Sequence, residues 1–174
     1  MLKIFINTWG NYNENGADGG RWVTLPMDED ELQEELNNIA EAMGDEDPEY
    51  CIHDYEWTTV YELGNINENE SIFDLNEKVQ RFDDLCEWKK KTFSAAVEYW
   101  GAKYVDPDDI DEYNLYTDIR DICDLGYYFV HEAGGYDLDK MGALANYIDY
   151  EAFGRDINLE TDGGFTSFGW IERC

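Results

Sequence analysis

The feature that most constrains how this chain can fold is its excess of negative charge. It contains 41 acidic and 12 basic residues, so its formal net charge at pH 7 is −29. Charge of this size repels itself and destabilises a compact state. However, 43% of the residues are hydrophobic and 16% are aromatic, whereas disordered acidic chains lack aromatic side chains. We therefore expect a folded protein that keeps most of its carboxylates on the surface.

The charge is distributed unevenly along the chain. Residues 1–62 contain 16 acids and 2 bases, residues 63–105 contain 8 and 6, and residues 106–174 contain 17 and 4. Three explanations stay open for so many carboxylates: solubility at high salt, binding of cations, or imitation of a polyanion. A solubility shell would spread its charge more evenly. Direct binding to nucleic acid is not expected, because the phosphate backbone would repel this chain.

The first part of the chain combines strands with one helix. Apolar residues alternate over residues 1–9 and 49–59, and a shorter strand is predicted at residues 21–25. Residues 10–20 are rich in Asn and Gly and predict a surface loop. Residues 28–43 have helical spacing, with Asp28 as the cap and Gly44 as the end of the helix. A small antiparallel sheet with a helix is expected here.

The middle of the chain is predicted to be helical. After a polar linker over residues 64–70, helical spacing runs from Ser71 to about Lys90. It restarts at Thr92 or Ser94 and ends at a glycine, which together predicts a helical mini-bundle.

The last part is predicted to contain helices and a short strand. Pro107 suits the first turn of a helix, and helical spacing follows over residues 119–133, 138–147 and 150–159. A strand is expected at residues 165–171. The whole chain is therefore predicted to be α+β, with three subdomains at residues 1–62, 63–105 and 106–174.

Motifs for catalysis and for metal or cofactor binding are not found. Residues 11–16 resemble the start of a calcium loop, but its twelfth position is Trp22 where a bidentate glutamate is needed. His53 and His131 have no partner at zinc-ligand spacing. An acid-adapted hydrolase would need a pocket with two converging carboxylates of different pKa. We expect a protein without a cofactor that is not an enzyme.

The sequence also indicates where the protein acts. No apolar run approaches the length of a membrane span, and no signal peptide opens the sequence. The four cysteines are spread singly, which is typical of free thiols in a reducing compartment. A cytoplasmic protein without membrane contact is expected.

Residues 146–157 read N-Y-I-D-Y-E-A-F-G-R-D-I. On a helix that begins near Asp149, the side chains of Tyr150, Phe153 and Ile157 share one face. From the residues alone, this apolar face is expected to pack into the core of the same chain.

Several motifs in a fixed order resemble the ArdA family of antirestriction proteins, which plasmids and conjugative transposons encode. The resemblance spans nearly the whole chain and is weakest over residues 63–103. The motifs are N-T-W-G-N-Y-N-E-N-G (7–16), G-G-R-W (19–22), D-P-E-Y-C-I-H-D-Y-E (47–56), D-L-G-Y-Y-F-V-H-E-A-G (124–134), the 146–157 segment, and F-T-S-F-G-W-I (165–171).

The resemblance implies a function and an assembly. A member of this family is expected to mimic duplex DNA and to occupy the DNA groove of type I restriction–modification enzymes, at their specificity and methyltransferase subunits. It is also expected to be an elongated, three-part monomer that forms a homodimer through its C-terminal part. The residues implied for the antirestriction motif and dimer contact are Tyr147, Asp149, Tyr150, Glu151, Phe153, Arg155 and Asp156.

The acids clustered in the two terminal parts are the candidates for the DNA-mimic surface. They are Asp28, Glu29, Asp30, Glu31, Glu34, Glu35, Glu41, Asp45, Glu46, Asp47, Glu49, Asp108, Asp109, Asp111, Glu112, Asp118 and Asp121. The alternative function is an acidic interaction module for another basic partner that binds nucleic acid. Competition with duplex DNA for a type I enzyme distinguishes the two.

Overall fold

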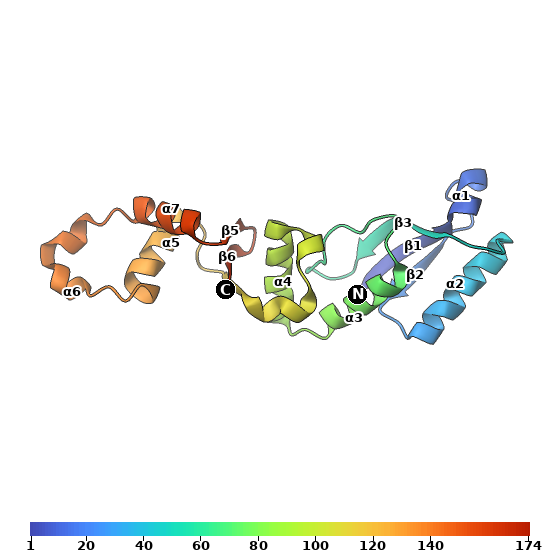
Figure 1. Ribbon diagram of the computed structural model, residues 1–174, viewed down its shortest axis with the longest axis horizontal. Coiled ribbons are helices and arrows are strands. Elements are labelled where there is room, and N and C mark those ends of the chain that lie inside the picture. The colour runs from blue at the N-terminus through green and yellow to red at the C-terminus, as the bar shows by residue number, and fades with distance from the viewer. The chain divides into compact units, whose positions relative to one another are not determined.

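The computed structural model describes all residues from 1 to 174, which form two compact units, Met1–Lys90 and Lys91–Cys174. Each unit contains one small antiparallel sheet and several helices (Figure 1), which confirms the predicted α+β class. The division into three subdomains stays a prediction. None of the helices has both the length and the apolar character needed to span a lipid bilayer.

The sheet of the first unit has three strands. Strand β1 (Leu2–Thr8) lies between β2 (Arg21–Leu25) and β3 (Tyr50–Trp57), and both neighbours run antiparallel to it. These are the three strands predicted from alternation. Leu2 and Ile4 are fully buried, because alternate residues of a strand point to the same face.

Helix α2 (Glu29–Met43) covers the apolar face of this sheet. It begins where the carboxylate of Asp28 accepts a hydrogen bond from the backbone N–H of Asp30 at 3.0 Å. It ends at Gly44, whose φ of 69° closes the last turn. The helix buries Leu32 and Leu36 and leaves its acids on the opposite side. The predicted helix is confirmed, including both caps.

The loop predicted at residues 10–20 is wrong in its first half, because helix α1 occupies Trp9–Asn15. The hydroxyl of Thr8 caps this helix by accepting a bond from the Asn11 N–H at 3.2 Å. Side-chain amides spaced four residues apart then bond in series. Asn11 donates to Asn7 and Asn15 donates to Asn11, both at 2.9 Å. These local bonds offset the poor helix propensity of Asn.

Cys51 lies on β3 and is 1% exposed, whereas Cys86, Cys123 and Cys174 are exposed. Burial, with the nearby charge of Glu68, raises the pKa of the Cys51 thiol to about 11. The reactive thiolate is therefore scarce at this position at pH 8.

We expect an aromatic disulfide reagent to label three of the four thiols of the folded protein at pH 8, counted by mass spectrometry. In a concentrated denaturant the fourth thiol should react as well. Rapid labelling of all four in the native protein would contradict the buried position of Cys51.

Two helices follow the first sheet. Helix α3 (Ile72–Asp83) begins at Ser71, whose hydroxyl caps it, and α4 spans Glu87–Trp100. The prediction of one helix reaching Lys90 and a second beginning at Thr92 or Ser94 is wrong in its boundary. The first helix ends at Asp83, and residues 84–86 connect it to α4.

Asn76 connects α3 to the segment that leads into α2. Its amide oxygen accepts from the backbone N–H of Met27 at 3.0 Å, and its amide nitrogen donates to the Met27 carbonyl at 2.9 Å. Asn76 is 9% exposed, so the two bonds are largely shielded from water.

Replacing Asn76 by Ala should lower the free energy of unfolding by about 2 kcal/mol, since two bonds of about 1 kcal/mol each are lost. Urea unfolding followed by circular dichroism measures this change. Asn38→Ala, at an exposed position of α2, is the matched control and should leave stability unchanged or slightly higher. Equal effects of the two substitutions would show that the Met27 contact contributes nothing.

The second sheet has the order β4-β6-β5, with strands at Tyr113–Tyr116, Gly169–Arg173 and Gly163–Thr166. The single strand predicted at residues 165–171 is wrong, because this segment folds back on itself as the β5–β6 hairpin. Strand β4 was not predicted, since four residues are too few to show alternation. The helix expected to begin at Pro107 is a 3₁₀ helix, η2 (Pro107–Glu112), after the short 3₁₀ turn η1 (Ala102–Tyr104).

Two of the three helices predicted over residues 119–159 are shorter than predicted. Helix α5 (Ile122–Tyr128) continues into a π-helical turn, η3 (Phe129–Ala133). The observed helical segment therefore begins three residues after the start predicted at residue 119 and ends where predicted, at residue 133. The helix predicted at 138–147 is α6 (Leu138–Met141) followed by the 3₁₀ segment η4 (Gly142–Tyr147). Helix α7 (Tyr150–Glu160) agrees with the prediction.

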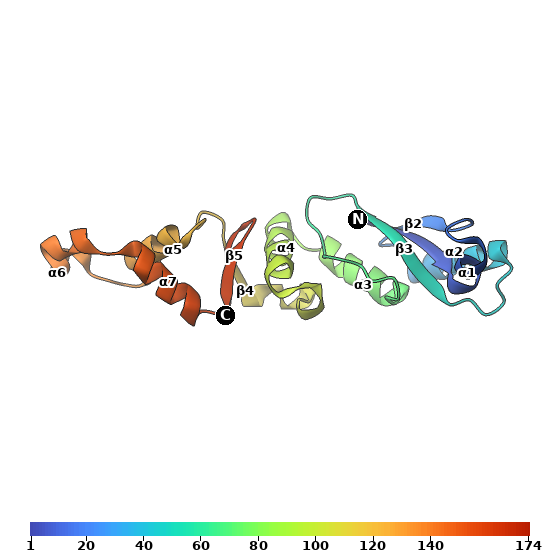
Figure 2. The same cartoon turned by 90° about the horizontal axis from the view of Figure 1, so that it is seen from above.

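The core of this unit lies between the sheet and the helix pair. Trp170 and Leu125 are fully buried, with Ile119 beside them, and Ile157 of α7 packs against this cluster. Helices α5 and α7 lie side by side in both views (Figures 1 and 2).

Candidate interaction surfaces

The predicted mimic acids of the first unit lie mostly on its surface. All are exposed except Glu35 and Asp45, which are half-buried. Helix α2 arranges many of them, because the buried stripe of Leu32 and Leu36 forces the remaining positions outward. The others lie in the segment that joins α2 to β3.

Some of these acids also stabilise the fold. Asp28 caps α2. Glu35 lies 3.7 Å from the guanidinium of Arg21, and the Asp45 carboxylate accepts from the Asp47 N–H at 3.3 Å. Substitution of Asp28, Glu35 or Asp45 would therefore change local structure as well as charge.

The six predicted acids of the second unit are all exposed, and they lie in η2 and before α5. Glu112 pairs with Arg173 at 2.6 Å, which leaves its charge partly neutralised. Asp121 caps α5 by accepting from the Asp124 N–H at 2.9 Å. The full set is Asp108, Asp109, Asp111, Glu112, Asp118 and Asp121.

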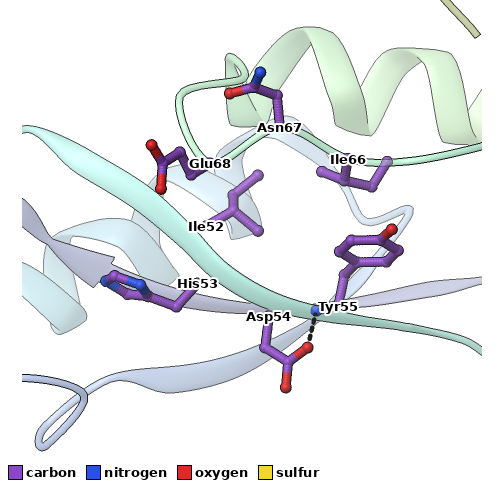
Figure 3. A pocket seen from close by; sticks show the side chains of 7 residues that line it. All are labelled: Ile52, His53, Asp54, Tyr55, Ile66, Asn67 and Glu68. Atoms are coloured by element: carbon purple, nitrogen blue, oxygen red, sulfur yellow. Dashed lines mark hydrogen bonds between the residues drawn. The ribbon is translucent and has the colours of Figure 1, made fainter.

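Two open hollows occur in the first unit. One, of about 380 Å³, lies between β3 and the loop at residues 66–68. Figure 3 shows that the carboxylate of Asp54 there points away from Asn67 and Glu68, toward its bond with the Tyr55 N–H. The other is lined by α1 and the loop after α2. No three His, Cys, Asp or Glu side chains of the chain are placed to share a metal ion.

The predicted antirestriction motif includes the start of α7, and its aromatic face contacts the same chain. Asp149 caps the helix by accepting from the Ala152 N–H at 3.0 Å. Tyr150 and Phe153 are half-buried. The Tyr150 hydroxyl lies 2.8 Å from Nε2 of His131, and Phe153 packs edge-on against Tyr136, with ring centroids 5.8 Å apart.

The charged residues of the motif stay at the surface. Arg155 pairs with Glu151 one turn earlier in α7, at 3.0 Å, and Asp156 is exposed. Tyr147 differs from the other aromatic residues of the motif, because 83% of it is exposed. The structure thus separates the motif into a helix packed on its own unit and an exposed tyrosine before it.

Sequence reasoning missed the closest contact of the motif. Gly154 of α7 and Gly126 of α5 are both buried and lie where the two helices cross. A Cβ atom on Gly154 would overlap the carbonyl oxygen of Ile122, and one on Gly126 would overlap that of Tyr150. The available signal was a glycine inside each of two helical patterns, where glycine lowers helix stability and so indicates a packing or functional reason.

Residues 134–148, which we call the arm, connect η3 to α7 and include α6 and η4. None of the arm residues is buried. In both views the arm extends from α5 and α7 on the side away from the sheet (Figures 1 and 2). Its exposed apolar side chains are Tyr147 at 83%, Leu144 at 69%, Tyr136 at 53% and Met141 at 39%.

Together these features define an acidic α+β protein whose dominant surface group is the carboxylate. Comparison with protein families matches residues 4–172 to the family described as "Antirestriction protein (ArdA)". The chain therefore belongs to the ArdA family of antirestriction proteins. A search of curated proteins finds no match.

Proposed function

We propose that this protein inhibits type I restriction–modification enzymes by imitating duplex DNA in their DNA-binding groove. The observation that carries the proposal is the exposed set of carboxylates on α2 and in the α2–β3 segment, in a part of the chain with 16 acids and 2 bases. A groove that binds DNA is lined by Lys and Arg, and it attracts any surface of dense negative charge. By this proposal the protein protects incoming mobile DNA in the cytoplasm.

The amount of charge is sufficient for this role. Two copies of the chain would carry 58 net negative charges, twice the 29 of one copy. At about one charge per 1.7 Å of duplex axis, this equals roughly 100 Å of DNA. Carboxylates held on a helix are ordered before binding, so little conformational entropy is lost when the complex forms.

We further propose that two copies associate through the arm. Exposed apolar side chains there would be removed from water in such a contact. Charge repulsion is also smaller in this region than in the segment before it. Residues 126–148 contain three acids and one lysine, whereas residues 106–125 contain eight acids and one arginine. In this proposal Tyr147 contacts the second copy, while Tyr150 and Phe153 support the arm from their own unit.

The test is binding of the purified protein to a type I methyltransferase core, with unlabelled duplex as competitor and salt titrated. Mutual exclusion with DNA and a steep loss of affinity with salt are expected. Binding that duplex does not displace would contradict DNA mimicry and favour an acidic module that docks elsewhere. An unrelated protein of similar net charge is the control for nonspecific attraction.

A further inference from the structure

Tyr127, His131 and Tyr150 form a cluster at the base of the arm, which we call the clamp. Nε2 of His131 and the hydroxyl of Tyr150 are 2.8 Å apart. The imidazole stacks on the ring of Tyr127, with centroids 4.1 Å apart and planes inclined by 23°. The two tyrosine rings are themselves 5.5 Å apart. The cluster joins two residues of D-L-G-Y-Y-F-V-H-E-A-G to the predicted antirestriction motif.

The clamp connects the two ends of the arm. His131 lies in η3, just before the arm begins, and Tyr150 is the first residue of α7, just after it ends. The π-helical turn is closed by a bond from the Gly134 N–H to the Phe129 carbonyl at 2.7 Å. Such turns are rare and change the direction of side chains within a helix. This one holds His131 where its ring reaches Tyr150.

The position of the arm depends on its ends. No residue between 134 and 148 is buried, so apart from the packing of Tyr136 on Phe153 the arm has no apolar core of its own to fix its place. We infer that His131 is a positioning residue: by holding Tyr150, it fixes the direction in which the arm presents Leu144 and Tyr147. This inference rests on the proposed contact between two copies through the arm.

The experiment measures arm order and self-association separately, in the full chain. Backbone order parameters of residues 134–148 are recorded by NMR in a Leu144→Asp background, so that no second copy contributes to order. Self-association is measured by sedimentation with Leu144 intact. The variants are His131→Ala, His131→Gln, Tyr150→Phe and the combination of His131→Ala with Tyr150→Phe.

His131→Ala and Tyr150→Phe should each lower the order parameters of the arm from about 0.8 toward 0.6. Each should also weaken self-association about fivefold, the effect of one lost hydrogen bond. The double variant should lose no more arm order and no more self-association than either single variant, because both substitutions remove the same hydrogen bond. His131→Gln should restore both properties, since its amide nitrogen occupies nearly the position of Nε2. Tyr104→Phe, at a 70% exposed tyrosine outside the clamp, is the control and should change neither.

The outcomes separate the two proposals. Unchanged arm order in His131→Ala overturns the role of His131, whatever the association shows. Lost order with unchanged self-association overturns the link between the clamp and the contact. A wild-type chain that stays monomeric at all concentrations overturns the contact through the arm, while the order measurement still decides whether His131 holds the arm.

Discussion

Replacing Gly154 by Ala is expected to destabilise the second unit by about 3 kcal/mol or more. The added methyl group would overlap the backbone carbonyl of Ile122, and backbone cannot move aside as a flexible side chain can. Helices α5 and α7 would have to separate, which would expose Leu125 and Ile157. Overpacking of a well-packed core usually costs about 1–3 kcal/mol, and contact with the backbone of α5 at both Ile122 and Gly126 places this site at the upper end. Gly126→Ala should destabilise the second unit by a similar amount, because its methyl group would overlap the carbonyl oxygen of Tyr150.

The measurement is urea unfolding followed by circular dichroism, with NMR spectra to locate the loss in the second unit. Arg155→Ala is the matched control one residue further along α7. Arg155 is exposed and makes an i,i+4 pair with Glu151, so its loss should cost about 0.5 kcal/mol or less. If Gly154→Ala were as mild as Arg155→Ala, the close crossing of α5 and α7 would be wrong. Antirestriction activity of Gly154→Ala should fall with the folded fraction.

Neutralising four acids of α2 should weaken inhibition of a type I enzyme about thirtyfold without unfolding the chain. The acids chosen are exposed and have no capping role, unlike Asp28, and no pairing role, unlike Glu35. If each contributes about 0.5 kcal/mol with a basic side chain of the enzyme, four contribute about 2 kcal/mol. The substitutions are Glu29→Gln, Glu31→Gln, Glu34→Gln and Glu41→Gln.

The control removes the same number of charges from the nearly neutral middle of the chain. All four control positions are exposed. They are Glu68→Gln, Glu77→Gln, Asp84→Asn and Glu87→Gln. Inhibition should be titrated at several salt concentrations, because the α2 variant is also expected to show a shallower salt dependence. Equal losses in both variants would mean that total charge matters and that α2 is not a specific part of the mimic surface.

Local sequence patterns predicted the elements that local chemistry decides. Helix α2 could be bounded to the residue, because Asp28 and Gly44 are strong caps on either side of an apolar stripe. The start of α7 near Asp149 was also predicted, and there the Asp149 carboxylate caps the helix. Helix α1 was missed because its Asn side chains bond to each other, whereas the general rule for Asn and Gly favours a loop. Strand β4 was missed because four residues show too little alternation.

The sequence alone also determined the chemistry of the surface. With 41 acids and 12 bases, no fold of this chain could bury its carboxylates, since a buried charge needs a partner and there are too few bases. An acidic exterior therefore followed from composition. The order of the motifs indicated the antirestriction family, which the match over residues 4–172 confirms.

Only the tertiary structure decided which apolar residues are used within the chain and which are left exposed. Tyr150, Phe153 and Tyr147 look alike in the motif, but the first two pack against His131 and Tyr136 while the third is 83% exposed. Their neighbours come from distant parts of the sequence, so helical spacing shows a shared face but not what covers it. The crossing of Gly126 and Gly154 has the same origin. Contacts between residues far apart in the chain depend on how helices pack, and a local pattern carries no information about that.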